Sequence, residues 1–102
     1  MASILNFHRP ANVAVDVDGV TDASVVFRMI RDVQRVFRHL VGAWRVTLRA
    51  SARGCWRLEL AGASGRHVWI FAAPTAALSA VVVEKVERFL RDSAPVWRTL
   101  PT

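Results

Sequence analysis

Four arginines in the first part of the chain are spaced so that a single helical face would carry all of them. Arg28, Arg31, Arg35 and Arg38 follow one another at intervals of three, four and three residues, which places them on one stripe of an α-helix. Asp32 is the one acidic residue among them. Like charges held side by side repel one another unless an anion or the solvent screens them. The spacing therefore predicts a surface that binds an anionic partner rather than a catalytic site.

The same segment has the apolar pattern of a helix that packs on a core. Its apolar residues form a second stripe on the opposite side of the helix: Val26, Met29, Ile30, Val33, Val36, Phe37 and Leu40. Thr21 or Asp22 can cap the start of this helix, and Gly42 is suited to end it after about Val41. One face is thus expected in the core, with the arginines in solvent.

The segments around this helix read as strands and a second helix. Residues alternate between apolar and polar in Asn12–Asp18, which predicts a half-buried strand. Three further strands are expected over Ala43–Ser51 and Cys55–Ala61, where apolar and polar residues again alternate, and over His67–Ala72. The short turns between them predict an antiparallel meander. Pro74 suits the first turn of a last helix over Thr75–Asp92. The inward residues of that helix are expected to be Leu78, Val82, Val86, Phe89 and Leu90.

This order, β-α-β-β-β-α, predicts a single α+β domain over residues 1–102. The ordered core is expected over about 12–92, with an irregular C-terminal tail at 93–102. Both helices have one apolar stripe, so both should cover the same face of a four-stranded sheet. The long helical crossover allows the first strand to pair in parallel with a later one. Which strand it joins stays open at this stage.

The charge of the chain is concentrated in one region. The net charge is +6, and residues 23–66 hold nine arginines against Asp32 and Glu59, a net charge of +7. A clustered excess is typical of proteins with a phosphate-rich or acidic partner. The last helix differs from the first, because its charges can balance one another. Glu84 can pair with Arg88, and Glu87 can pair with Arg91, at i,i+4 spacing.

The open face of the predicted sheet is a second candidate surface. It is expected to present Arg45, Arg49 and Arg57 as secondary phosphate contacts, together with Thr47, Cys55, His67, Trp69 and Phe71. Basic and aromatic side chains on one face can bind phosphates and stack on bases. Trp69 and Phe71 also support an alternative, in which this face is an interface for a second subunit or a protein partner.

Catalytic and metal chemistry have little support. The segment Val13–Thr21, with Asp16, Asp18 and Gly19, resembles the first motif of haloacid dehalogenase-type phosphatases. That resemblance implies a nucleophilic Asp16, an acid/base Asp18 and bound magnesium, but the other motifs of the family are missing and the chain is too short for its fold. The three histidines and one cysteine fit no metal-ligand spacing. We therefore expect no enzyme activity, no metal and no cofactor.

Targeting signals and cysteine content favour the cytoplasm. Cys55 is the single cysteine, so no intrachain disulfide can form, which fits a reducing compartment. No run of about 20 apolar residues is present, and the N-terminus lacks the pattern of a signal peptide. We expect a cytoplasmic protein that does not enter a membrane.

The element order over Asn12–Asp92 resembles the ribosome hibernation-promoting factor and ribosome-associated inhibitor family. Supporting features are Thr21 before a long helix, the alternating segments Trp44–Ala50 and Trp56–Leu60, and Ala72-Ala73 leading into a helix with Val86-Glu87-Arg88-Phe89-Leu90. The resemblance implies binding in the decoding region of the small ribosomal subunit. The chain departs from the family pattern in having Ala73-Pro74-Thr75 in place of an acidic-x-Tyr signature, and in lacking the lysine-rich end of the last helix.

Two functions follow as hypotheses. The first is a small basic protein that binds structured RNA, with the ribosome as a candidate partner, through the arginines of the first helix. The alternative is a protein-interaction module, either a homodimer or an inhibitor of an acidic protein, that uses the open sheet face. The sequence identifies neither the RNA nor the protein partner.

Overall fold

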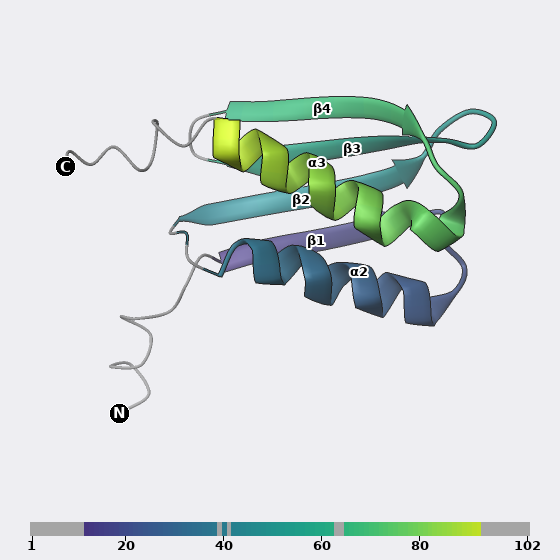
Figure 1. The fold of residues 1–102 in the computed structure, drawn as a ribbon, viewed down its shortest axis with the longest axis horizontal. Helices are drawn as coiled ribbons and strands as arrows, with labels where there is room; N and C mark the ends of the chain where they lie inside the picture. Colours follow the sequence, from purple (N-terminus) through teal and green to yellow (C-terminus); the bar gives the residue numbers. More distant parts are fainter. Residues whose placement is uncertain (1–11, 39, 41, 63–64, 93–102) are drawn as a thin grey trace.

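The chain folds as one sheet with two helices packed on it (Figure 1). The computed structural model describes residues 12–38, 40, 42–62 and 65–92. Its elements, in chain order, are β1 (Asn12–Asp18), α2 (Ala23–Val36), β2 (Ala43–Ala50), β3 (Cys55–Gly62), β4 (Gly65–Ala72), a 3-10 turn (Thr75–Ala77) and α3 (Leu78–Asp92). The predicted α+β order is confirmed. The predicted irregular tail at 93–102 lies outside the described residues.

The sheet has the strand order β1-β2-β3-β4. β1 runs parallel to β2, with Asn12 opposite Ala43, and the other two pairs are antiparallel. Helix α2 is the crossover that allows the parallel pair. Both helices lie on the same face of the sheet, as predicted, and leave the other face open (Figure 1).

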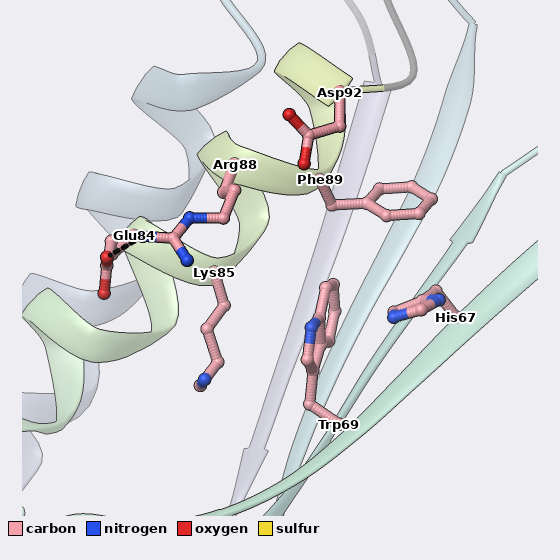
Figure 2. A pocket seen from close by; sticks show the side chains of 7 residues that line it. All are labelled: His67, Trp69, Glu84, Lys85, Arg88, Phe89 and Asp92. Carbon is pink, nitrogen blue, oxygen red and sulfur yellow. Dashed lines mark hydrogen bonds and ion pairs between the residues drawn. The ribbon is translucent and has the colours of Figure 1, made fainter.

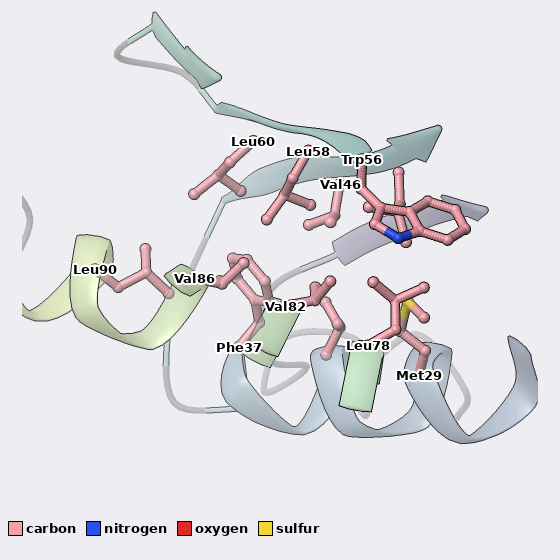
Figure 3. Close-up of a cluster of buried hydrophobic side chains, with 12 residues drawn as sticks. Met29, Phe37, Val46, Trp56, Leu58, Leu60, Leu78, Val82, Val86 and Leu90 are labelled. Carbon is pink, nitrogen blue, oxygen red and sulfur yellow. The ribbon is translucent and has the colours of Figure 1, made fainter. Parts of the chain in front are cut away.

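The core lies between the sheet and the two helices (Figure 3). Its buried side chains are Met29, Val33, Phe37, Val46, Leu48, Trp56, Leu58, Leu60, Leu78, Val82, Val86 and Leu90. Val13, Val15 and Val17 of β1 pack against this cluster from one edge. Alternate residues of β2 and β3 therefore point inward, and their neighbours form the open face.

Helix α2 starts where the sequence indicates but ends earlier. The Asp22 side chain accepts a hydrogen bond from the Ser24 N–H at 2.9 Å and caps the helix. The predicted end near Val41 is wrong, because regular α-helix stops at Val36. Beyond Val36 the N–H groups of Phe37 and Arg38 donate hydrogen bonds to carbonyls three residues back, which is the 3-10 pattern common at the end of an α-helix.

The last helix has a different start from the one predicted. Pro74 is extended, residues Thr75–Ala77 form a 3-10 turn, and α3 itself begins at Leu78. Its end at Asp92 agrees with the prediction. Neither described helix has the length and apolar character needed to cross a bilayer.

The predicted facing of β4 is wrong. Leu58 lies opposite Trp69, and Trp56 lies opposite Phe71. Residues opposite one another in an antiparallel pair share a face, so Trp69 and Phe71 lie on the helix-covered side with the core residues of β3. Val68 and Ile70 instead point to the open face. Of these four residues of β4, the two aromatic ones, Trp69 and Phe71, pack against the core cluster.

Candidate nucleic-acid interface

The four arginines of the first helical segment lie on the outer surface, away from the sheet. Arg28, Arg31 and Arg35 are exposed on α2, and Arg38 is exposed in the turn that follows it. We call these four residues the arginine stripe. On the opposite side of α2, Met29 and Val33 are buried in the core. The predicted placement of the stripe is confirmed, except that Arg38 extends it beyond the end of the helix.

The arginine stripe has little neutralising charge around it. The single ion pair that any of its members makes within the described residues joins Arg31 Nε to Asp32 Oδ1 at 3.8 Å. Hydrogen bonds from Ser24 lower the pKa of Asp22, and the positive charge of Arg28 lowers it further. Asp32 and Asp22 thus offset part of the charge of Arg31 and Arg28. Arg35 and Arg38 make no ion pair within the described residues, and their charge remains available to an anion from solution.

The side of α2 that faces α3 is less basic. Asp32 points towards α3, where its Oδ2 accepts a hydrogen bond from the Ser79 hydroxyl at 3.3 Å. A hollow of about 330 Å³ lies between the two helices, and Arg35 lines it together with Asp32 and Glu87. These carboxylates would repel a phosphate that entered between the helices. The favourable approach for phosphate is therefore from the outer side of α2.

An exposed aromatic ring lies beside the stripe. Phe27 is 71% exposed on α2, and it is four residues before Arg31, so the two side chains are neighbours on the helix surface. Phe27 was not predicted as a functional residue. The sequence does indicate that Phe27 is exposed, because its position around the helix lies outside the apolar stripe of the segment. An aromatic ring next to arginines can stack on an unpaired base while the arginines bind phosphates.

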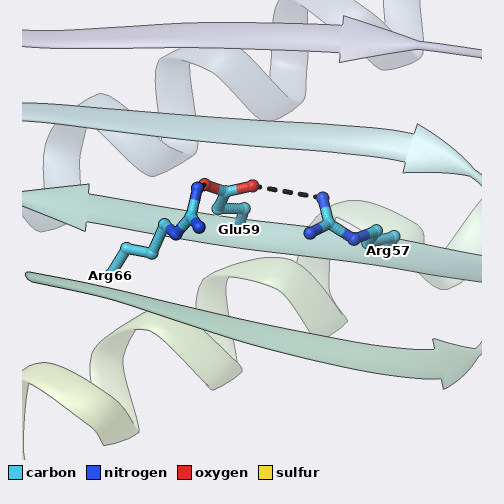
Figure 4. Close-up of polar contacts among 3 residues, drawn as sticks. All are labelled: Arg57, Glu59 and Arg66. Atoms are coloured by element: carbon cyan, nitrogen blue, oxygen red, sulfur yellow. Dashed lines mark hydrogen bonds and ion pairs between the residues drawn. The ribbon is translucent and has the colours of Figure 1, made fainter.

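The open sheet face is a mixture of charges rather than a basic surface. Arg45 pairs with Asp16 at 3.2 Å. Glu59 accepts from Arg57 at 3.1 Å and from Arg66 at 3.2 Å (Figure 4). Of the predicted secondary phosphate contacts, Arg45 and Arg57 are thus neutralised by carboxylates, while Arg49 makes no ion pair within the described part of the chain.

Glu59 is held in its charged form by this arrangement. Partial burial of the carboxylate raises its pKa, but the hydrogen bonds and positive charges of Arg57 and Arg66 outweigh that effect and leave the pKa of Glu59 below its ordinary value. The three residues therefore act as a local structural network, and a phosphate would have to compete with Glu59 for both arginines.

The aromatic residues predicted for the open face lie elsewhere. The His67 ring is 4.4 Å from Trp69 and 4.8 Å from Phe89 of α3, measured between ring centroids. The ammonium group of Lys85 lies 5.1 Å from the centre of the Phe71 ring. These contacts join β4 to α3, so the predicted interface role of Trp69 and Phe71 on the open face is wrong in its placement.

Acidic and metal-ligating residues are scattered over the structure. Asp16 and Asp18 are both exposed, and Asp16 is paired with Arg45. Cys55 is a half-buried free thiol. Within the described residues no three His, Cys, Asp or Glu side chains come together as a group able to hold a metal ion.

The resemblance to ribosome hibernation-promoting factors stays a prediction from element order and the local features given above. The chain matches no protein-family model, and no curated protein is significantly similar to it.

Proposed function

We propose that this protein binds RNA, and that the arginine stripe contacts the phosphate backbone. The observation that carries the proposal is the grouping of four exposed arginines along one surface, where Asp32 supplies the single carboxylate within 4 Å among the described residues. A stripe of this kind has unfavourable self-repulsion in the free protein, and phosphates relieve it. Phe27 next to Arg31 supports RNA with unpaired bases as the preferred form.

The comparison with α3 supports the same conclusion. Both helices lie on the same face of the sheet and both expose a polar side. On α3, Glu84 accepts from Arg88 at 2.8 Å, and Glu87 lies across from Arg35. The predicted Glu87–Arg91 pair is not formed within the described residues, yet both signs are still present on that helix. The imbalance on α2 is thus specific to one helix.

Structured RNA in the cytoplasm is the proposed partner class, with the small ribosomal subunit as the first candidate. That candidate rests on the element order shared with hibernation-promoting factors. Three of the four arginines that would bind lie on α2, and Arg38 lies in the turn that follows it. RNA binding itself stands on the arginine stripe and does not need the ribosome as its partner.

The proposal is tested by binding to ribosomes and to a structured-RNA pool across a salt series. If the arginine stripe neutralises four phosphates, the log–log slope should be about −3 to −4. In the double variant Arg31→Glu/Arg35→Glu the affinity should collapse and the slope should fall by about two. The matched control is Arg53→Glu/Arg91→Glu, which makes the same change of net charge at two exposed arginines outside the stripe.

The outcomes separate the stripe from simple net charge. Loss of binding in the stripe variant alone supports the proposal, and equal loss in both variants would show that only overall charge matters. Binding that does not respond to salt would overturn it. A preference for ribosomes over the RNA pool would identify the ribosome as the partner.

A further inference from the structure

The two edges of the sheet differ in how they are protected. Both β1 and β4 have one side without a strand partner in the described structure. β1 carries the exposed carboxylates of Asp16 and Asp18. β4 has Arg66 near its start but no charged residue and no proline from Val68 to its end at Ala72. Free edges are usually blunted by charge, proline or a bulge, because their unpaired N–H and C=O groups attract other strands.

β4 is also regular along its whole length. It pairs with β3 residue by residue from Gly65 to Ala72, with no bulge in the register. In an antiparallel pair every second residue directs both its N–H and its C=O away from its partner. The outer side of β4 therefore presents a straight row of donors and acceptors suited to one more strand.

Apolar side chains accompany this edge on the open face. Ile70 is 61% exposed and Val68 is 38% exposed, and Phe27 is the only other large hydrophobic residue exposed in the described part of the chain. Val68 and Ile70 are two residues apart, so both point to the same side of the sheet. The side chains of an added strand would pack beside them on that face and reduce their exposure.

The helix-covered side of the same edge carries both signs of charge. A hollow of about 260 Å³ opens between β4 and α3, with Trp69 and Phe89 in its wall (Figure 2). Glu84 and Asp92 line it with Lys85 and Arg88, two acidic and two basic residues. A surface with equal numbers of both signs can face a copy of itself across a two-fold axis.

We infer that the free edge of β4 is a dimer interface, where β4 of a second copy of this chain pairs antiparallel to form an eight-stranded sheet. Antiparallel pairing separates the charged starts of the two strands, because Arg66 of one copy then lies towards Ala72 of the other. Parallel pairing would place Arg66 beside Arg66. With Trp69 at the axis, Ile70 of each copy lies opposite Val68 of its partner on the open face.

The test is the oligomeric state of the full chain over a concentration series by analytical ultracentrifugation. The contact is small, so we expect the monomer mass of 11.4 kDa at low concentration and twice that mass at high concentration, with a Kd on the order of micromolar. Ile70→Lys places a charge in the middle of the interface and should keep the protein monomeric throughout. The matched control is Phe27→Lys, the same change at an exposed residue of α2, which should leave dimerisation unchanged.

Hydrogen exchange adds a readout at the strand itself. Alternate amides of β4 should exchange more slowly as the concentration of the wild-type protein rises, and circular dichroism should show that Ile70→Lys remains folded. A wild-type protein that stays monomeric would overturn the inference, and so would a dimer that tolerates Ile70→Lys. Slow exchange of these amides in the dilute monomer would also overturn it, since another part of the chain would then cover the edge.

Discussion

The indole N–H of Trp56 donates a hydrogen bond to the carbonyl oxygen of Ala73 at a distance of 3.0 Å. Trp56 is in β3 and only 7% exposed, whereas Ala73 lies directly after β4 and before the turn into α3. The bond therefore fixes the point where the chain leaves the sheet to begin its last helix.

Trp56→Phe should separate this bond from the packing of the ring. Phenylalanine keeps most of the apolar contact but leaves the Ala73 carbonyl unpaired, so we expect the free energy of unfolding to fall by about 1–3 kcal/mol. Trp56→Ala should lower it by about 3–5 kcal/mol, since it also opens a cavity. Urea denaturation measures both variants. A Phe variant as stable as the wild type would mean that the bond contributes nothing.

Phe27→Ala should weaken the binding of RNA with unpaired bases by about 1–3 kcal/mol, the contribution of one stacked base. The salt slope should not change, because no phosphate contact is lost. Stability should stay within about 0.5 kcal/mol, as the side chain is exposed. Phe27→Trp is the control and should retain the affinity. An equal loss for fully double-stranded RNA would contradict a stacking role.

Asp32→Asn should strengthen RNA binding. The substitution removes the carboxylate that pairs with Arg31 of the arginine stripe, while the amide oxygen can still accept the hydrogen bond from Ser79. We expect an affinity gain of about twofold to fivefold at low salt. Ser79→Ala is the control for any loss of the Ser79 hydrogen bond, because it removes that bond but keeps the charge of Asp32, and its RNA affinity should equal that of the wild type. Unchanged affinity in Asp32→Asn would show that phosphates bind far from this carboxylate.

Glu59 should make the stability of the protein depend on acid pH. Its pKa in the folded state lies below the ordinary value of 4.5, so its stabilising contribution is complete above that value and is lost as the pH falls through the folded-state pKa. The variant Glu59→Gln should therefore be less stable than the wild type at neutral pH, and the difference should shrink as the solution is acidified below pH 4.5. Denaturant titrations at several pH values measure this. A constant difference would exclude Glu59 as the titrating group.

Strong periodicity allowed most of the fold to be predicted. In β2 and β3 apolar and polar residues alternate cleanly, and their inward residues Val46, Leu48, Leu58 and Leu60 are buried as expected. β4 has no such alternation, because Val68, Trp69, Ile70 and Phe71 are all apolar. The length of the turn between β3 and β4 decides which β4 side chains face the core. Only two residues separate Gly62 from Gly65, and this places Leu58 opposite Trp69.

Only part of the candidate site could be predicted from the sequence, because only some of its features depend on residues close together in the chain. The arginine stripe follows from helical spacing, which depends on residues close in sequence. Ion pairs such as Arg45 with Asp16 join residues on different strands, and they depend on the parallel register of β1 with β2, which the sequence left open. Phe27 was overlooked because its helical position lies outside the apolar stripe and it carries no charge, so neither pattern in the segment included it.

The parallel pairing of β1 with β2 determines the order in which the chain can assemble. β2, β3 and β4 meet through short connections and can form early, whereas β1 must wait until α2 and β2 have both been made. During synthesis the first strand therefore spends the longest time without a partner. Asp16 and Asp18 place two negative charges on β1 while it is unpaired, and such charges disfavour pairing of β1 with strands of other chains. Asp16, which pairs with Arg45 on the open face after folding, thus also protects the nascent chain, together with Asp18, before it folds.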